Sequence, residues 1–348
     1  MQKKKSNISS LFLIVSFIIV LAVISVFAYK YVTDDINGNR TNESNDIKCI
    51  IILDGSNDIY DVSLTLENSY IIKNSTVWSY WMDNNYPDME IVPGEYSVSA
   101  DMSYDEIAKS LKNPIVTHRR VSVCIPEGFD VFKIASVLDE KGVCSYDDFL
   151  SACNDVSLYE AVFDQTLPSN DKVAYSLEGF LFPATYDFYE NMEPAKIIDD
   201  MLCAFSERIK PEWNEFCDKN GYTMYELVTL ASIVERETLG EGVAQNISSV
   251  FINRLNIGQK LQSDVTIDYG NKLRSAGFED EVVFSYNTYK CSALPSGPIC
   301  NPGVENIDSV VNHNDTDYFY FFSDLQNEFH FAKDYDEFEQ LKQKYPWQ

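Results

Sequence analysis

TMYELVTLASIVERET, residues 223–238, is the stretch of this sequence that most directly predicts a structure. Thr223 and Glu226 have the spacing of a capping box, which begins a helix by satisfying its first free backbone N–H groups. Apolar residues then follow at positions i, i+3, i+4 and i+7, namely Leu227, Leu230, Ala231 and Val234. This spacing predicts a helix that begins near residue 224 and packs one face into a protein core.

Two glutamates lie on the flanks of that apolar face. At about 100° per residue, Glu235 falls beside Ala231, whereas Glu237 falls on the opposite side beside Leu230. Partial burial penalises the charged form of a carboxylate and raises its pKa, which suits a general acid near neutral pH. The spacing does not decide between the two glutamates. It also leaves open a structural role, in which either one pairs with a nearby cation at a domain edge.

Three further blocks carry a resemblance to a known family. They are LEGFLFPATY (177–186), VFINRLNIGQKLQSDVTIDYG (250–270), and YNTY with LPSGPICNPG (286–303). In this order, and together with ASIVERET (231–238), they resemble the MltG/YceG-like endolytic murein transglycosylases. The sequence departs from the family pattern at Arg236, where Lys is more usual, and at Val265, where Pro is usual. The second departure puts the shape of that loop in doubt.

The resemblance implies an enzyme, a lyase, in which Glu235 is the single catalytic acid and base. Such an enzyme cleaves the β-1,4 bond between N-acetylmuramic acid and N-acetylglucosamine inside peptidoglycan strands and leaves a 1,6-anhydro end. Acting near the membrane, it would limit the length of new strands. The alternative is a non-catalytic wall-binding or scaffolding protein of the same fold, although the intact ASIVERET argues against it. A hydrolase that pairs Glu235 with Glu237 is disfavoured, since residues two apart on a helix diverge by about 200°.

The blocks around the predicted helix also predict the walls of a sugar-binding cleft. Tyrosine rings and short polar side chains suit the faces, hydroxyls and amides of sugars, although any one of 22 tyrosines is more often a core residue. Glu178 is interpreted as a brace for the turn that follows it, and a supporting role near the substrate stays open for Glu178 and Glu237. We expect substrate contacts from Gln262, Ser263, Asp264, Tyr286, Asn287, Thr288 and Tyr289.

Composition excludes some kinds of partner. The net charge of −27 leaves no basic surface for nucleic acid, whereas it is compatible with an uncharged or zwitterionic glycan. The three histidines are far apart in sequence and no C-x-x-C motif occurs, so we expect no metal and no cofactor. All eight cysteines follow the N-terminal apolar segment; an extracytoplasmic location would permit disulfides, but the sequence does not fix their pairing.

An apolar run near the N-terminus predicts a membrane anchor. Residues 11–29 are interrupted only by two serines, and we expect a single transmembrane helix over residues 11–31. A cleaved signal peptide fits less well, because the run is long and is followed by a poor cleavage site. Three lysines at positions 3–5 predict that residues 1–10 stay in the cytoplasm. The remainder would then face the cell wall, with glycan strands and wall-synthesis or division proteins as partners.

The rest of the chain predicts an α+β protein in consecutive parts. Residues 32–48 are polar and without periodicity, which is typical of a flexible linker. Residues 49–159 contain short strand and helix patterns that resemble LysM-like units, one of them a strand, a turn and a helix over residues 94–111. Residues 160–348 have dense aromatic, glycine and proline punctuation between helices, and we expect a mixed α+β catalytic domain there.

Overall fold

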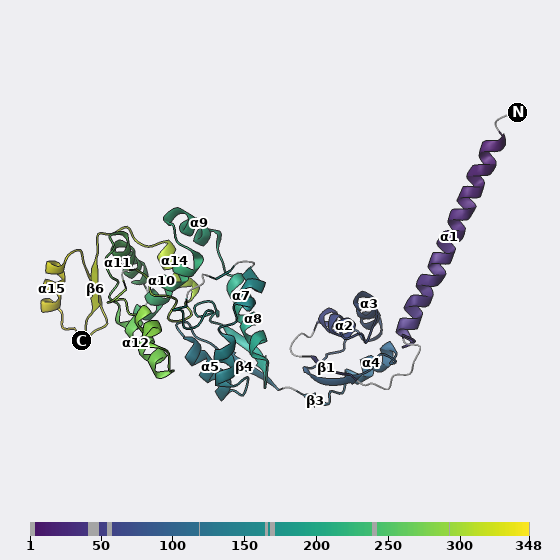
Figure 1. Ribbon diagram of the computed structural model, residues 1–348, viewed down its shortest axis with the longest axis horizontal. Coiled ribbons are helices and arrows are strands. Elements are labelled where there is room, and N and C mark those ends of the chain that lie inside the picture. Colours follow the sequence, from purple (N-terminus) through teal and green to yellow (C-terminus); the bar gives the residue numbers. More distant parts are fainter. Residues whose placement is uncertain are drawn as a thin grey trace. The chain divides into compact units, whose positions relative to one another are not determined.

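The computed structural model describes residues 4–40, 49–53, 58–117, 119–163, 166–167, 171–238, 242–291 and 293–347. It divides into two compact units, residues 1–119 and residues 120–348, which are described separately (Figure 1). In the described residues, helices alternate with short strands that form three small antiparallel sheets. The architecture is therefore of mixed helix and strand, as the α+β prediction required.

The first unit begins with a long helix, α1 (Lys4–Ile36). Within it, the 23 residues Ile14–Ile36 have a mean hydropathy of 2.2, and none of the most apolar window is buried against the rest of the chain. Length and composition therefore make this helix a candidate membrane span, in agreement with the predicted span over residues 11–31. The side of the membrane that each end faces stays a prediction.

The expected flexible linker does not begin at residue 32. Helix α1 continues to Ile36, and Asp35 in its last turn is buried. The Asp35 carboxylate accepts hydrogen bonds from the Tyr104 hydroxyl at 2.6 Å and from the backbone N–H of Lys73, and it pairs with Arg40. A buried carboxylate with three partners fixes the end of the helix to the folded unit. Residues 41–48, the rest of the predicted linker, lie outside the described residues.

A three-stranded antiparallel sheet, in the order β1-β2-β3, forms the centre of the first unit. Alternate residues of β2 are buried, and they pack with helix residues such as Trp78 and Leu66 in one apolar core. Ser103 and Glu106 form a capping box at the start of α4, which confirms the strand, turn and helix predicted over residues 94–111. The elements are β1 (Cys49–Leu53), α2 (Ile59–Asn68), α3 (Ser75–Asn85), β2 (Gly94–Val98), α4 (Tyr104–Ser110) and β3 (Val116–Thr117).

The second unit is mostly helical and holds the larger apolar core. Its first part consists of β4 (Arg120–Cys124), α5 (Val131–Glu140), α6 (Tyr146–Ala152), α7 (Val156–Phe163), β5 (Thr185–Tyr189), α8 (Pro194–Ser206) and α9 (Pro211–Asn220). Its second part consists of α10 (Met224–Glu237), α11 (Ala244–Asn256), α12 (Asp264–Ser275), α13 (Asp280–Ser285), α14 (Val304–Val311), β6 (Tyr320–Ser323), β7 (Phe329–Ala332) and α15 (Tyr335–Lys344).

The boundary between the units falls at residue 119 rather than at the expected residue 159. Strand β4 pairs with β5 along its whole length, from Arg120 opposite Tyr189 to Cys124 opposite Thr185. Helices α5 and α6 also bury Ile134 and Phe149 in the core of the second unit. Residues 120–159 are therefore part of the second unit and do not belong to the LysM-like region in which we placed them.

Helix α10 lies at the centre of the second unit, in contact with α9, α11, α12 and α14 (Figure 1). It begins as predicted, with the Thr223 side chain accepting from the Glu226 N–H and the Glu226 carboxylate accepting from the Thr223 N–H. Every residue from Leu227 to Val234 is buried, and burial decreases only at Glu235 and beyond. The core thus fixes the helix and leaves its last turn accessible.

The seven cysteines whose side chains the structure describes are all free thiols. Cys291 and Cys300 bracket the loop before α14 without bonding to each other: the Cys291 thiol contacts the carbonyl of Asn287 and the Cys300 thiol contacts that of Ser232. Burial raises the pKa of the Cys300 thiol well above its ordinary value. Cys300, like the buried Cys153 and Cys217, is therefore a packing group in this fold.

Candidate functional site

Glu235 lies in the last turn of α10 and faces the start of α14. Its Oε2 atom accepts hydrogen bonds from the backbone N–H of Gly303 at 3.0 Å and from the side-chain amide of Asn306 at 2.8 Å. Gly303 is the N-cap of α14, so the carboxylate also lies at the positive end of a helix dipole. Among the described residues, no hydrogen bond reaches Oε1 of Glu235. One oxygen is thus held in place and the other is unused.

The turn before α5 closes over the same carboxylate. Gly128 has a φ of +74°, and a Cβ on it would come within 3.4 Å of Cγ of Glu235. The backbone N–H of Gly128 donates to the carbonyl of Asn301 at 2.9 Å, which joins this turn to the loop before α14. The preceding residue, Glu127, lies directly against Gly303. Partial desolvation of this exposed side chain, together with the nearby charges of Glu235 and Glu305, raises the pKa of Glu127.

Glu127 is not among the residues that the sequence predicted for the site. Within CIPEGFDV (124–131) it precedes a glycine in a turn, which by itself indicates only a reversal of the chain. Only the return of the chain some 175 residues later brings Gly303 beside it. The one signal in the sequence is an acidic side chain next to a glycine.

Two hollows adjoin the residues around Glu235. One, of about 670 Å³, is lined by Asn306 together with Thr238, Gly242, Ala244, Gln245, Glu305 and Ser309. The other, of about 800 Å³, is lined by Arg236 and Glu237 and by aromatic residues of the C-terminal hairpin and helix, among them Tyr320, Phe322, Tyr335, Phe338 and Trp347. An aromatic wall with a few polar groups is a typical lining for a sugar site.

Glu237 faces the larger hollow. Its Oε1 accepts a hydrogen bond of 2.5 Å from the hydroxyl of Ser263, and burial raises the pKa of its carboxyl. Arg236 also lines this hollow, and its guanidinium lies 3.4 Å from the carbonyl of Gly128. Residues Glu235 to Glu237 therefore contact three segments: the turn before α5, the loop before α14 and the loop at Ser263.

The seven predicted substrate residues divide into two groups. Gln262, Asp264 and Tyr289 are exposed and line the larger hollow, where the Tyr289 hydroxyl donates to Asp264 at 2.8 Å. Gln262 has a φ of +52°, a strained conformation for a residue with a side chain. These three side chains can reach a ligand in the hollow.

The other four have less exposed side chains. Ser263 and Thr288 are buried and bonded to each other, since the Ser263 N–H donates to Thr288 Oγ1 at 2.9 Å. Tyr286 is fully buried and its hydroxyl accepts from the backbone of Ala174. Asn287 is half-buried and holds the turn by accepting from the N–H of Tyr289. These residues join the loops that carry the exposed ones, and their substrate contacts stay a prediction.

Glu178 lies in the interior, with no exposed surface. Its carboxylate accepts from the backbone of Val131 at 3.0 Å, from the Tyr269 hydroxyl at 3.0 Å and from the amide of Asn301 at 2.8 Å. Burial, followed by the charge of Asp130, raises the pKa of Glu178 to about 8. This residue braces three segments and has no access to a ligand in this conformation.

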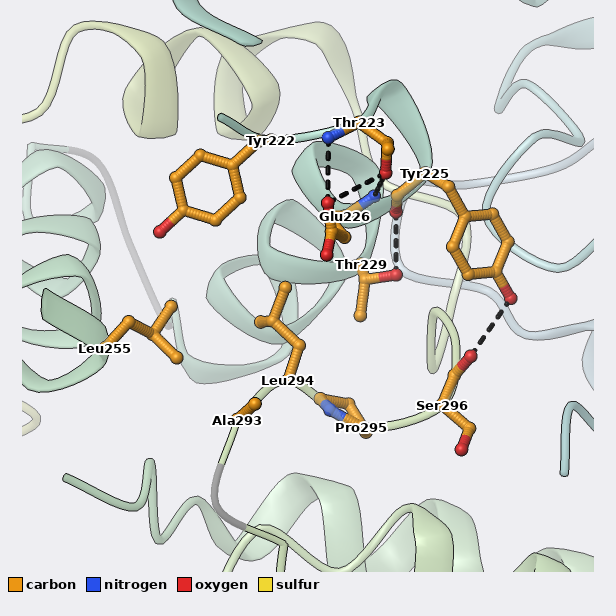
Figure 2. A pocket seen from close by; sticks show the side chains of 10 residues that line it. All are labelled: Tyr222, Thr223, Tyr225, Glu226, Thr229, Leu255, Ala293, Leu294, Pro295 and Ser296. Atoms are coloured by element: carbon orange, nitrogen blue, oxygen red, sulfur yellow. Dashed lines mark hydrogen bonds between the residues drawn. The ribbon is translucent and has the colours of Figure 1, made fainter. Parts of the chain in front are cut away.

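A third hollow, of about 460 Å³, lies at the opposite end of α10 (Figure 2). Glu226 is on its wall, but that carboxylate is used in the capping box with Thr223. The Thr229 hydroxyl donates to the carbonyl of Tyr225, and the Tyr225 hydroxyl donates to that of Ser296. The polar side chains shown in Figure 2 are therefore largely satisfied within the protein, and they offer little to a reaction.

Among the described residues, one acidic and histidine cluster has the spacing to hold a metal ion: Asp324, Glu328 and His330. The Asp324 carboxylate already accepts from the backbone N–H groups of Gln326 and Glu328 and contacts the His330 ring at 2.9 Å. These bonds close the turn between β6 and β7. The cluster therefore has a complete structural role without an ion.

Comparisons with known proteins agree with the arrangement of these blocks. The model of the YceG-like family matches residues 52–344. A protein of Streptococcus pneumoniae (strain D39) named endolytic murein transglycosylase is 30% identical over 345 residues, which are 90% of this chain and 61% of that protein. A protein of Bacillus subtilis with the same name is 27% identical and covers 82% of this chain and 81% of its own.

A crystal structure at 2.6 Å of a YceG-like protein from Listeria monocytogenes is also similar. It is 26% identical, with a TM-score of 0.57 over 86% of this chain and 100% of that one. The present chain spans about three fifths of the length of the pneumococcal relatives that it matches. Because the family model matches most of its residues, the chain belongs to the YceG-like family.

Proposed function

We propose that this protein is an endolytic peptidoglycan transglycosylase with Glu235 as its acid and base. The observation that carries the proposal is the geometry of that carboxylate: Oε2 is held by Gly303 and Asn306, whereas Oε1 has no partner among the described residues and the side chain is only partly buried. The names of the pneumococcal and Bacillus relatives support the same activity.

The reaction needs only one carboxylic acid. Protonated Glu235 would give its proton to the oxygen between N-acetylmuramic acid and N-acetylglucosamine, and so release the N-acetylglucosamine side of the strand. The resulting carboxylate would then take the proton from the C6 hydroxyl of the muramyl sugar as that oxygen bonds to C1. An internal hydroxyl held near C1 acts as an effectively unimolecular nucleophile, which allows it to outcompete water. The product is a 1,6-anhydro end.

Cleavage inside a strand requires binding on both sides of the bond that breaks. The two hollows beside Glu235 offer this, one through Asn306 and the other through Arg236 and Glu237. Tyr289, Gln262 and Asp264 would contact sugar on the side of the larger hollow, where aromatic rings from β6 and α15 provide apolar surface. We therefore propose that a glycan strand passes across the exposed end of α10.

The N-terminal helix supports a location at the cell membrane. With lysines at positions 3–5, ahead of the apolar part of α1, the N-terminus would be cytoplasmic and the second unit would face the wall. The order β1, α2, α3, β2 in the first unit is compatible with the LysM-like module that we expected, and a glycan-binding role for it belongs to the proposal. Wall-synthesis or division proteins are the proposed partners of such an anchored enzyme.

Mass spectrometry of products formed in ¹⁸O-enriched water tests the proposal. The detergent-solubilised protein should release fragments that end in 1,6-anhydro-N-acetylmuramic acid and carry no oxygen from solvent. Labelled reducing ends as the main product would identify a hydrolase instead. An absence of cleavage, with glycan binding retained, would favour the non-catalytic wall-binding alternative. The matched control is Glu235→Gln, which keeps the shape of the side chain and cannot carry the proton.

A further inference from the structure

Glu127 and Glu235 adjoin the same residue. The backbone N–H of Gly303 donates to Oε2 of Glu235 at 3.0 Å. On the other side, a Cβ added to Gly303 would overlap the carboxylate of Glu127, with only 2.0 Å to its Oε1 atom. The two acidic groups are thus neighbours across one glycine, although about a hundred residues separate them in the sequence.

The glycine at position 303 has no conformational reason to be a glycine. Its φ of −74° and ψ of 163° are ordinary extended values that alanine adopts without strain. A Cβ at this position would instead meet the Glu127 carboxylate, the far end of a flexible side chain, and would displace it. Glycine at position 303 therefore leaves room for Glu127 beside the residue that donates to Glu235.

Glu127 differs from Glu235 in its hydrogen bonding. Among the described residues, Glu127 has neither a hydrogen bond nor an ion pair, whereas Glu235 accepts two hydrogen bonds at the N-terminus of α14. Donors and a helix N-terminus stabilise the ionised form of a carboxylate. Since a general acid must hold a proton, another influence has to oppose these donors. A second carboxylate nearby has that effect, because two negative charges in one place repel.

We propose that Glu127 is a positioning residue for the reactive proton: it and Glu235 hold one proton between them, and the singly protonated pair is the active form. This inference rests on the proposed function and adds a second residue to it. The raised pKa of Glu127, caused first by partial desolvation of this exposed side chain and then by the Glu235 charge, is consistent with the proposal.

Other ionisable groups around the pair modify this effect. Glu305, in the first turn of α14, adds a third negative charge and also raises the pKa of Glu127. Arg236 opposes both through its guanidinium, which lies 3.4 Å from the carbonyl of Gly128. Cys300 is buried and its raised pKa keeps it a neutral thiol. Glu305 and Arg236 thus act in opposite directions, and Glu127 is the acidic group that adjoins Gly303.

The test is the pH profile of cleavage by the full-length, detergent-solubilised protein on purified peptidoglycan. In Glu127→Gln, the negative charge that helps Glu235 to retain its proton is lost. As the pH rises, cleavage activity should therefore begin to decline at a lower pH than in the unmodified protein. We expect a displacement of about half a unit to one unit, which on the alkaline side means a rate about three to ten times lower. Glu305→Gln should displace the profile less, and Glu140→Gln, at the exposed end of α5, not at all.

A second variant examines the geometry. Gly303→Ala should force the Glu127 carboxylate away and displace the profile as Glu127→Gln does. In a double variant with Glu127→Ala, the space is free, and the alanine at 303 should add little further loss. If Gly303→Ala instead causes the same loss with and without the Glu127 side chain, the glycine has another purpose and the inference fails.

The outcomes separate this inference from the proposed function. If the unmodified protein cleaves peptidoglycan and Glu127→Gln has the same pH profile, Glu127 is not coupled to the reactive proton. If the unmodified protein does not cleave at any pH, the proposed function itself fails. A folded Glu127→Gln protein with lower activity at every pH and an unshifted profile would indicate a structural role only, and would also overturn the inference.

Discussion

Glu178 and Glu235 occupy two regions of the second unit that differ in their access to solvent. Both accept hydrogen bonds from the loop before α14, Glu178 from Asn301 and Glu235 from Gly303. Glu178 is fully buried and uses both of its oxygens, which accept three hydrogen bonds. Glu235 is partly exposed, and among the described residues only one of its oxygens is used.

The comparison teaches that a perturbed carboxylate is not by itself a reactive one. Glu178 has the raised pKa that is often taken as a sign of catalysis, and the cause is burial in a network that leaves no room for a ligand. Glu235 has fewer partners, one oxygen without a hydrogen bond among the described residues, and neighbours in Asn306, Arg236 and Glu237 that line two hollows. A catalytic acid needs contact with its substrate before it needs an unusual pKa.

The largest expected effect is the loss of cleavage in Glu235→Gln. Removal of a general acid and base costs about a hundredfold to ten-thousandfold in rate, and the variant should retain its unfolding midpoint because its amide can still accept from Gly303. Cleavage assays and thermal unfolding of the same preparation measure both quantities. An active Glu235→Gln protein would show that Glu235, like Glu178, is not the reactive carboxylate.

Glu178→Gln should show the reverse pattern, with lower stability. Val131 N–H can only donate, and Asn301 is fixed as a donor because its own oxygen accepts from Gly179 and Leu181. In either orientation of the glutamine, its NH₂ group opposes one of these donors. Above about pH 8, where Glu178 is an ionised carboxylate that accepts from all three donors, the loss should be about 1–3 kcal/mol of unfolding free energy. Urea unfolding measures it. Tyr269→Phe is the matched control, because it removes one partner and opposes none.

Local spacing in the sequence predicted much of this fold. The capping box at Thr223 and the strand, turn and helix over residues 94–111 lie where the sequence indicated. Each depends on residues within a few positions of one another. The boundary between the units depends instead on the pairing of β4 with β5, which lie some 60 residues apart. The residue spacing within either strand does not identify the strand with which it pairs.

The sequence separated the residues around the candidate site only in part. Gln262 and Asp264 line one hollow with Arg236 and Glu237, the two residues that follow Glu235, but Tyr286 and Tyr289 could not be told apart by residue type. Three positions separate them, and one is fully buried while the other is exposed. Glu127 was missed because its significance depends on Gly303, which only the complete fold brings near.

A smaller effect is expected on the pH dependence of stability. The pKa of Glu178 is about 8 in the folded protein, above its ordinary value of 4.5, so the folded state binds this proton more tightly than the unfolded state. Its contribution is therefore fully present below pH 4.5 and is lost as the pH rises to about 8. Unfolding free energies across this window should fall less steeply in Glu178→Gln. Equal slopes in the two proteins would show that Glu178 does not hold a proton in the folded state.

The smallest expected effect is on activity in Glu237→Gln, the residue that the sequence could not separate from Glu235. Its Oε1 accepts from the Ser263 hydroxyl, and the carbonyl oxygen of glutamine can accept the same bond, so the loop that carries Gln262 and Asp264 should stay in place. We expect cleavage to fall by less than about tenfold, because only a charge at the wall of the larger hollow is lost. Ser263→Ala breaks the same contact from the other side and should have a similar effect. If Glu237→Gln abolishes cleavage while Glu235→Gln retains it, the reactive carboxylate faces the aromatic hollow, and the two glutamates of the last turn of α10 exchange their roles.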